Sequence, residues 1–338
     1  MSYGFVTGTN TDTDELTIEQ LQRENALLKE KNRQLTSRLA DLQQHSQSLS
    51  YNYIKTSRSP DAMTCDYTGL TKFSLLTWLC CTLHEKLPAK PSKLSVNDRI
   101  LLVLVKLKLA ITNQDIALRF GISVQCVSVV LCTHVNTMAN LLKFLVPWPD
   151  RDVVNANMPK QCKKNFPHCR VVVDCTEVYS ERSKNLQARA QMYSHYKSHS
   201  TIKFLVGISP SGAFTYISKC WGGRASDKLI TVEDGLLDKM DHGDAVLADR
   251  GFLVSEELAV RGVTLITPAF TKGRKQLTPK QVEVSRQISR FRIHVERAIR
   301  RLKTYKIMKS QMPISLVRYA DSIAVICAAL CNLRGRLF

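Results

Sequence analysis

The sequence predicts an α/β fold, in which a mixed sheet with flanking helices follows an all-α region and an N-terminal coiled coil. Before Pro149 the apolar residues recur mostly at helical spacing, and after it they form short runs separated by turns. With 338 residues and 44% hydrophobic content, the chain can bury a full-sized core and still carry smaller modules. We therefore divide it into segments 1–15, 16–50, 51–92, 93–150 and 151–338.

Residues 16–50 carry a leucine at every seventh position, the d position of a heptad repeat. These leucines are Leu21, Leu28, Leu35, Leu42 and Leu49. Asn25 and Asn32 fall at the a position, where an asparagine is best satisfied by a second asparagine across a two-stranded seam. The repeat favours a parallel homodimer through residues 16–50, and the alternative is one amphipathic helix packed on its own chain. Residues 1–15 are polar and are expected to be a disordered lead-in.

Two apolar stretches predict packed helices ahead of the sheet. Residues 51–92 are expected to hold a linker and one packed helix over 73–83. Residues 96–109 are too densely apolar for a surface helix, which predicts a core helix capped by Ser95 or Asn97. Because many of the eleven cysteines lie in apolar runs, we expect reduced, buried thiols. These cysteines include Cys80, Cys81, Cys126, Cys132, Cys327 and Cys331.

Residues 93–150 have the outline of a helix-turn-helix. Thr112 can cap a short helix, Gly121 can make the turn, and Ser123 can cap a second helix. If that second helix entered a DNA major groove, Ser123, Gln125 and Ser128 would lie nearest the base edges. The alternative is a plain helical hairpin that supports the next segment, since the second helix carries few Lys or Arg residues.

Residues 151–338 predict five strands and two helices. The strands are expected at 171–173, 203–208, 213–218, 245–248 and 264–267. One helix is expected over 227–240, between the third and fourth strands, and a long one over 280–303. The buried stripe of the long helix is expected to be Val284, Ile288, Phe291, Val295 and Leu302.

Two of the predicted strands end in an aspartate, which places a carboxylate at the edge of a buried sheet. These are Asp174 and Asp249, and Glu296 lies beside the apolar stripe of the long helix. A carboxylate in apolar surroundings has a raised pKa or needs a compensating cation. Three such groups form the hard oxygen set that Mg²⁺ or Mn²⁺ selects, and they could hold two ions about 4 Å apart.

The formal net charge of +19 points to a polyanionic partner, and nucleic acid is the first candidate. Residues 271–338 hold 16 Lys or Arg residues against only Glu283, Glu296 and Asp321. No apolar run is long enough to span a bilayer, and the N-terminus lacks the order of a signal peptide. We therefore expect a DNA partner and no membrane partner.

Six short motifs follow one another in a specific order between residues 150 and 335. They are VVVDCTE at 171–177, YK at 196–197, TIK at 201–203, Gly223 with SD at 226–227, LADRGF at 247–252 and VER at 295–297. This ordered set resembles the DDE nuclease domain of PIF/Harbinger transposases, and the preceding helix-turn-helix is similar to the one that accompanies that domain. The resemblance implies an RNase H-like fold and metal-dependent cutting of DNA.

The resemblance also implies roles for individual residues. It assigns Asp174, Asp249 and Glu296 as catalytic acids that bind Mg²⁺ or Mn²⁺, with two ions around the scissile phosphate. Basic side chains would balance DNA phosphates, although Lys203 and Arg250 could equally be solvated charges. The basic residues are Lys203, Arg250, Arg297, Arg300 and Arg301. Many relatives carry a zinc-finger module where this chain has its leucine heptad. A separate DNA-binding partner protein could therefore recognise the DNA ends in its place.

Four residues near the motifs have competing interpretations. Glu177 should point to the opposite face of its strand from Asp174 and is expected to be structural. Asp227 follows Ser226 at a helix start, where either would serve as an N-cap. His195 and His199 are four residues apart, which would suit metal ligation on a helix, but we expect a polar surface near DNA.

The leading interpretation is a metal-dependent DNA endonuclease or transposase, acting in the nucleus if the host is eukaryotic, with a cytoplasmic fraction. The alternative is a domesticated DNA-binding or scaffold protein whose acid triad is unused. A basic zipper transcription factor does not fit, because residues 1–17 contain no Lys or Arg ahead of the heptad.

Overall fold

The computed structural model describes residues 11–45, 48–88, 94–269, 276, 278–335 and 337. The chain divides into two compact units, Met1–Leu49 and Ser50–Phe338. The predicted segments 51–92, 93–150 and 151–338 therefore all lie in the second unit.

The first unit is a single helix, α1 (Thr11–His45). It begins before residue 16, so part of the expected lead-in is helical, while residues 1–10 lie outside the described residues. Three heptad leucines are more than half exposed: Leu21 at 60%, Leu28 at 55% and Leu35 at 56%.

The helical half of the second unit contains more helices than predicted. It comprises α2 (Tyr51–Lys55), α3 (Pro60–Thr68), α4 (Phe73–His84), α5 (Val96–Leu109), α6 (Asn113–Phe120), α7 (Val124–Leu142) and the 3₁₀ helix η1 (Lys143–Leu145). The expected helix over 73–83 is α4, but α2 and α3 occupy much of the expected linker. Pro60 begins α3, and Gly69 ends it with a φ of 78°, which explains these short helices from local residue types. The predicted core helix is α5, capped by Ser95.

The helix-turn-helix is present with the predicted caps. The Thr112 hydroxyl accepts a hydrogen bond from the Asp115 amide at the start of α6. Gly121 ends α6 in the left-handed conformation, and the Ser123 hydroxyl then accepts from the Cys126 amide to start α7. These contacts are local, which is why residue types alone predicted them.

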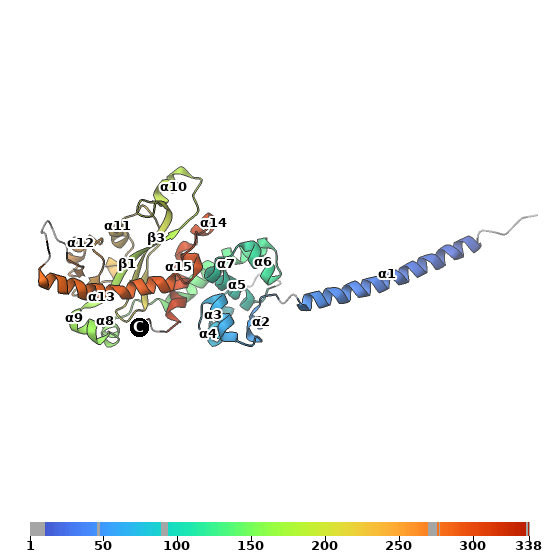
Figure 1. The fold of residues 1–338 in the computed structure, drawn as a ribbon, viewed down its shortest axis with the longest axis horizontal. Coiled ribbons are helices and arrows are strands. Elements are labelled where there is room, and N and C mark those ends of the chain that lie inside the picture. Colours follow the sequence, from blue (N-terminus) through green and yellow to red (C-terminus); the bar gives the residue numbers. More distant parts are fainter. Residues whose placement is uncertain are drawn as a thin grey trace, which may run out of the picture. The chain divides into compact units, whose positions relative to one another are not determined.

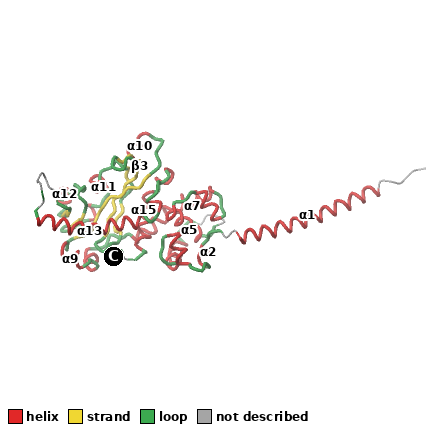
Figure 2. Tube along the Cα trace, in the orientation of Figure 1, coloured by secondary structure: helices red, strands yellow, loops and turns green. Residues whose placement is uncertain are grey.

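A mixed sheet of seven strands forms the centre of the other half (Figure 2). The strands are β1 (Cys169–Tyr179), β2 (Tyr193–Ser194), β3 (His199–Ile208), β4 (Phe214–Ile217), β5 (Trp221–Gly222), β6 (Ala245–Leu247) and β7 (Thr264–Ile266). Their order is β2-β3-β1-β6-β7, and both β4 and β5 also pair with β3. β1 is antiparallel to β3 and parallel to β6. This arrangement is consistent with the predicted RNase H-like fold, with β2 and β5 added to the five expected strands.

Two predicted element boundaries differ from the structure by six or more residues. β1 does not end at Asp174 but continues to Tyr179, because β3 pairs with it over that whole length. The helix expected over 227–240 ends at Glu233, and Gly235, with a φ of 81°, separates it from a 3₁₀ turn. In β1 the strand pairing with β3, and in α11 the glycine Gly235, determine where the element ends, and apolar periodicity indicates neither.

Ten further helices and 3₁₀ turns surround the sheet. They are α8 (Arg151–Ala156), α9 (Lys160–Asn165), α10 (Leu186–Met192), α11 (Asp227–Glu233), η2 (Leu237–Lys239), α12 (Ser255–Ala259), α13 (Pro279–Leu302), η3 (Lys306–Met308), α14 (Ile314–Val317) and α15 (Ala320–Asn332). The long helix α13 agrees with the predicted range and packs against β1 and β3. Its predicted stripe is buried except at Val284, which is 43% exposed because it lies in the early turns of the helix.

All eleven cysteines are free thiols, but they are not all buried. Cys80, Cys327 and Cys331 are buried as predicted. Cys81 and Cys132 are exposed, because each lies on the outer side of a helix whose other side forms the core.

Within the described ranges, no single helix is both long and apolar enough to cross a membrane, although the bent pair Asn113–Phe120 and Val124–Leu145 would pass on length and composition.

Candidate active site

Asp174 lies in the middle of β1, on the face opposite the main apolar cluster. Val171 and Val173 pack into that cluster, so strand alternation turns Asp174 to the other face. The carboxylate is half-buried, and its Oδ1 accepts a hydrogen bond from the Cys175 amide at 2.9 Å. Burial raises the pKa of Asp174 to about 6, although nearby Arg292 acts in the opposite direction.

Asp249 follows β6, whose parallel register pairs Leu247 with Val172 on β1, so Asp249 lies level with Asp174 on the neighbouring strand. Its Oδ1 accepts a hydrogen bond from the Arg250 amide at 2.7 Å and lies 3.1 Å from Nη1 of Arg292. The negative charge of Asp249 contributes to the raised pKa of Asp174. The two aspartates are therefore close enough to repel each other.

Glu296 lies on α13, one helical turn after Arg292. Its Oε1 is 3.7 Å from Nη2 of Arg292, so this arginine contacts Asp249 with one nitrogen and Glu296 with another. The Arg292 side chain is only 14% exposed, whereas Asp249 and Glu296 are 46% and 53% exposed. Arg292 thus contacts Asp249 and Glu296 directly, both of which are open to solvent, and its charge also acts on the pKa of Asp174.

The acids offer only carboxylate oxygens, the donors that Mg²⁺ and Mn²⁺ prefer. In the described parts of the chain, no three His, Cys, Asp or Glu side chains converge on one ion position as they stand. Arg292 contacts both Asp249 and Glu296, so its guanidinium occupies space that an ion shared by these two carboxylates would need. The residue types therefore fit a divalent cation, and the acids could close on it only after the guanidinium moved away.

Lys203 and Asp227 form an ion pair beside the acids, which the sequence did not predict. Lys203 Nζ lies 2.6 Å from Asp227 Oδ1 and donates to the Ala225 carbonyl oxygen at 3.2 Å. Burial lowers the pKa of Lys203, but the bond to Asp227 outweighs it and the pKa is raised. The Lys203 side chain is only 12% exposed and is paired with Asp227. It therefore does not lie on an exposed surface, where the expected contact with DNA would require it.

Asp227 is not an N-cap. The cap of α11 is the Ser226 hydroxyl, which accepts a hydrogen bond from the Leu229 amide. The carboxylate of Asp227 instead raises the pKa of Asp174, which places it near the acid cluster.

Glu177 and Lys303 contact each other near Asp174. Glu177 Oε2 accepts a hydrogen bond from the Thr201 hydroxyl at 2.8 Å, in agreement with the predicted structural role. Lys303 Nζ donates to the Glu177 carbonyl oxygen at 3.2 Å. Burial and the charge of Lys197 lower the pKa of Lys303, while Asp174 has the opposite effect.

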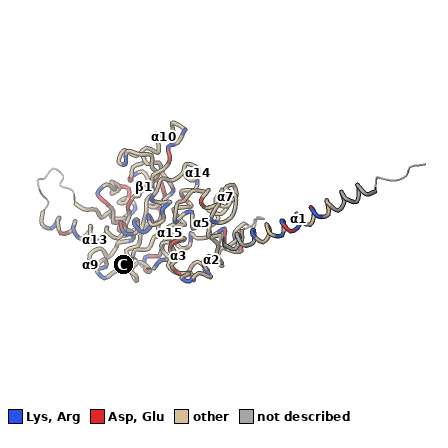
Figure 3. The backbone as a smooth tube through the Cα atoms, turned by 45° about the vertical axis from the view of Figure 1, so that its right-hand side comes forward, with Lys and Arg blue, Asp and Glu red and all other residues tan. Residues whose placement is uncertain are grey.

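Sequence reasoning missed Arg292 as a site residue and expected Lys303 only as part of a basic patch on the long helix. Helical spacing could have indicated them, because Arg292 and Glu296 share one face of α13 and Lys303, the residue that ends the helix, continues that face. Lys and Arg residues recur along this helix, where they appear blue in Figure 3.

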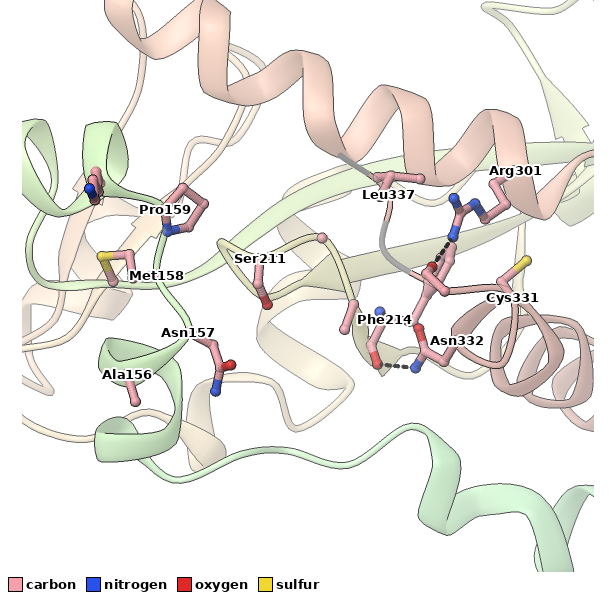
Figure 4. A pocket seen from close by; sticks show the side chains of 14 residues that line it. Ala156, Asn157, Met158, Pro159, Ser211, Phe214, Arg301, Cys331, Asn332 and Leu337 are labelled. Atoms are coloured by element: carbon pink, nitrogen blue, oxygen red, sulfur yellow. Dashed lines mark hydrogen bonds between the residues drawn. The ribbon is translucent and has the colours of Figure 1, made fainter.

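The other predicted DNA contacts differ in accessibility. Arg250, Arg297 and Arg300 are exposed. Arg301 is half-buried, and its Nη1 donates to the Gly335 carbonyl oxygen at 2.7 Å beside a cavity of about 640 Å³ (Figure 4). Arg301 therefore contacts the C-terminal segment.

On the helix-turn-helix, Ser123 and Gln125 are exposed at the start of α7. Ser128 is half-buried, and its hydroxyl accepts from Asn113 Nδ2 at 3.3 Å and donates to the Val124 carbonyl oxygen at 3.2 Å. Ser128 thus contacts α6, and Gln125 is the predicted base contact with the freest side chain.

His195 and His199 do not lie on a helix. His195 is in the turn between β2 and β3, and His199 is the first residue of β3. Their rings contact Tyr193 and Tyr179, with centroids 5.5 and 5.6 Å apart. The helical spacing argument for metal ligation does not apply to this pair.

Comparison with protein families gives two matches. Residues 173–332 match the family described as DDE superfamily endonuclease. Residues 92–144 match the helix-turn-helix of DDE superfamily endonuclease. A search of curated proteins finds no match.

Proposed function

We propose that this chain, whose residues 173–332 match the DDE superfamily endonuclease family, is a metal-dependent DNA nuclease of the transposase type. The proposal is supported by the position of Asp174, Asp249 and Glu296 near Arg292, which contacts the latter two and whose charge acts on the pKa of Asp174. Their carboxylates come from β1, the end of β6 and α13, so three separate elements of the fold supply one site. The PIF/Harbinger subfamily is part of the proposal and is supported by the order of the sequence motifs.

Asp174, Asp249 and Glu296 would hold two Mg²⁺ or Mn²⁺ ions, which supply activation of the attacking water or hydroxyl and stabilisation of the leaving oxygen. The chain's own residues position the phosphate and balance its charge. Arg250, Arg297 and Arg300 are exposed and suited to phosphate contact. The Lys203–Asp227 pair, at 2.6 Å, anchors α11 against β3 behind the acids.

The helix-turn-helix and the leucine heptad supply recognition and assembly in this proposal. The matched segment 92–144 would bind DNA through the exposed start of α7, with Gln125 nearest the bases. The exposed leucines of α1 support a parallel homodimer. A separate DNA-binding protein would assist end recognition, and in a eukaryotic host the protein would act in the nucleus.

A nicking assay tests the proposal. The purified full chain should nick supercoiled DNA with Mg²⁺ or Mn²⁺, and Asp174→Ala, Asp249→Ala and Glu296→Gln should each abolish nicking while keeping DNA affinity. Asp238→Ala is the matched control, because Asp238 is an exposed acid paired with Arg261 away from the triad. If all three triad variants nick as fast as the wild type, the site assignment is wrong.

One observation favours a second function, a DNA-binding scaffold with an unused triad. Arg292 already neutralises Asp249 and Glu296, so the acids have a cation without any metal. Calorimetry distinguishes the two functions: Mn²⁺ uptake that is lost in Asp249→Ala supports the nuclease, and no Asp249-dependent uptake supports the scaffold. Under either function, the logarithm of DNA affinity should fall linearly with the logarithm of salt, by about 0.9 per neutralised phosphate.

A further inference from the structure

A second cavity, of about 710 Å³, lies at the far end of β1 and β3, beside α10 and the β2–β3 hairpin. Its volume falls within the range of about 300–1,000 Å³ that is usual for small-molecule and cofactor sites. The described residues that line it include three arginines, two histidines and a tyrosine, and no Asp or Glu. These six are Arg182, Arg189, Arg224, Tyr193, His195 and His199.

The walls of this cavity are fixed by close backbone packing. A side chain at Gly222 would collide with the Gln191 carbonyl group, and one at Gly223 would collide with the Thr201 hydroxyl. Gly222 on β5 and Gly223 after it therefore let the chain pass close to α10 and β3 just before Arg224, which lines the cavity. Arg189 Nε donates to the Ser183 carbonyl oxygen at 3.1 Å, which fixes the direction of this guanidinium.

Aromatic rings and cations alternate at the rim. Tyr193 is 42% exposed, and its ring lies edge-to-face against His195 at 5.5 Å. In the hairpin turn, Tyr196 is 83% exposed and Lys197 Nζ lies 4.5 Å from the centre of its ring. Ser198, also in this turn, has a φ of 53°, an uncommon conformation for a residue other than glycine. Exposed rings beside cations are the combination that stacks bases and binds phosphates of single strands.

The cavity lies at a distance from the acids that one DNA strand could span. Asp174 and Ser180 lie on or next to β1, six residues apart, which corresponds to about 20 Å along an extended strand. That length equals roughly six nucleotides at about 3.4 Å per step. Lys303 Nζ donates to the Glu177 carbonyl oxygen on β1, between Asp174 and Ser180, and Lys197 lies in the hairpin turn next to Ser198, which lines the cavity. Cationic side chains therefore lie along this length of β1 and at the cavity.

We propose that this cavity binds an unpaired nucleotide of the DNA substrate, about six positions from the scissile phosphate. The base stacks on Tyr193, and Arg189 and Arg224 bind the flanking phosphates. A paired base has both faces covered by its neighbours, so only an unpaired base can lay its face on the tyrosine ring. The inference rests on the proposed action on DNA and adds a single-strand subsite to it.

The test is a binding measurement on the full chain in EDTA, which prevents cutting. Fluorescence anisotropy compares a blunt duplex with the same duplex carrying a single-stranded overhang, and 2-aminopurine in the overhang reports stacking. The wild type should prefer the overhang and quench the 2-aminopurine. Tyr193→Ala and Arg189→Ala should weaken overhang binding by about tenfold while blunt-duplex binding is unchanged.

Two variants serve as controls. Tyr193→Phe keeps the ring and should keep the preference, and Arg261→Ala removes an exposed arginine paired with Asp238 and should change neither affinity. A wild type without overhang preference, or a Tyr193→Ala variant that still quenches 2-aminopurine, would overturn the subsite. Preserved overhang binding with no nicking in Mn²⁺ would reject the nuclease proposal and leave the subsite standing.

Discussion

Arg292 joins two of the three acids through a single guanidinium group. Its contacts at 3.1 Å to Asp249 and 3.7 Å to Glu296 are charge-assisted, and only 14% of its side chain is exposed. A divalent cation bound by the same carboxylates would have to displace it. Arg292 therefore stabilises the acids in the absence of metal and would compete with a metal ion for them.

Removing this competing charge should strengthen metal binding. In Arg292→Ala the three carboxylates repel each other without compensation, so the metal-free protein should melt at a lower temperature than the wild type. Mn²⁺ should then raise its melting temperature more than that of the wild type, with about tenfold tighter binding by calorimetry. Arg286→Ala on the same helix is the control, because Arg286 pairs with Glu283. Equal Mn²⁺ affinities in Arg292→Ala and the wild type would contradict this role.

The raised pKa of Asp174 predicts a pH dependence of stability in the metal-free protein. Burial raises this pKa from 3.8 to about 6, so the folded state favours the protonated carboxyl. Its contribution to stability is fully present below about pH 4 and is lost as the pH rises through about 6, a loss of about 3 kcal/mol. Asp174→Asn, which cannot ionise, should remove this dependence.

Urea unfolding in EDTA at several pH values measures the effect. The free energy of unfolding of Asp174→Asn should exceed that of the wild type increasingly between about pH 4 and 6 and by a constant amount above that. A difference that is the same at pH 4 and pH 7 would show that Asp174 has an ordinary pKa.

At the scale of secondary structure, locally determined elements were predictable and pairing-dependent ones were not. The caps Thr112 and Ser123 act within three residues, so residue type alone predicted both helices of the helix-turn-helix. The continuation of β1 to Tyr179 and the two-residue strands β2 and β5 depend on pairing with β3, which lies far away in sequence.

The same distinction holds for the candidate site. The three acids were predicted from motifs and their resemblance to a family. The Lys203–Asp227 pair joins β3 to α11, and the contact of Arg292 with Asp249 joins α13 to the end of β6. Such contacts require the folded arrangement of elements, and the sequence could have suggested only the shared helix face of Arg292 and Glu296.

The leucine heptad of α1, which we propose forms a coiled coil, leads to a prediction at the element scale. Asn25 and Asn32 are expected to hold α1 in a parallel two-stranded register, because each amide pairs with its equivalent across the seam. Asn25→Leu with Asn32→Leu should therefore shift the protein from a dimer toward higher oligomers, as measured by analytical ultracentrifugation. Leu28→Ala should weaken the dimer, whereas Leu27→Ala, one position away at c, should not. Identical sedimentation of the Leu28→Ala and Leu27→Ala variants would exclude the heptad seam.

Across the whole second unit, the helix-turn-helix and the sheet form one body. The inner face of α7 is buried, and α7 packs against α15, where the Ser322 hydroxyl lies 2.8 Å from Asn136 Oδ1. Lys108 Nζ on α5 donates to the Thr304 carbonyl oxygen beyond α13 at 3.3 Å. α7 therefore supports the sheet and at the same time presents its first turn to solvent, so the two interpretations of this hairpin are compatible.

Asn332, at the end of α15, is the polar link in this arrangement (Figure 4). Its Nδ2 donates to the Leu145 carbonyl oxygen at 2.7 Å and to the Phe214 carbonyl oxygen at 2.9 Å. Its Oδ1 accepts from the Phe214 amide at 2.9 Å. One side chain thus connects η1, which follows α7, with β4 of the sheet.

Asn332→Ala should destabilise the whole unit rather than one part of it. The substitution removes three hydrogen bonds and leaves their partners partly buried, at a cost of about 2–4 kcal/mol in the free energy of unfolding. Because η1 and β4 are held by the same side chain, circular dichroism and tryptophan fluorescence should report one shifted urea transition. Asn157→Ala is the matched control, since Asn157 is exposed and its Nδ2 makes one bond, to the Val153 carbonyl oxygen at 2.9 Å. That control should cost less than about 1 kcal/mol, and an equal loss in both variants would show that Asn332 does not couple the two halves.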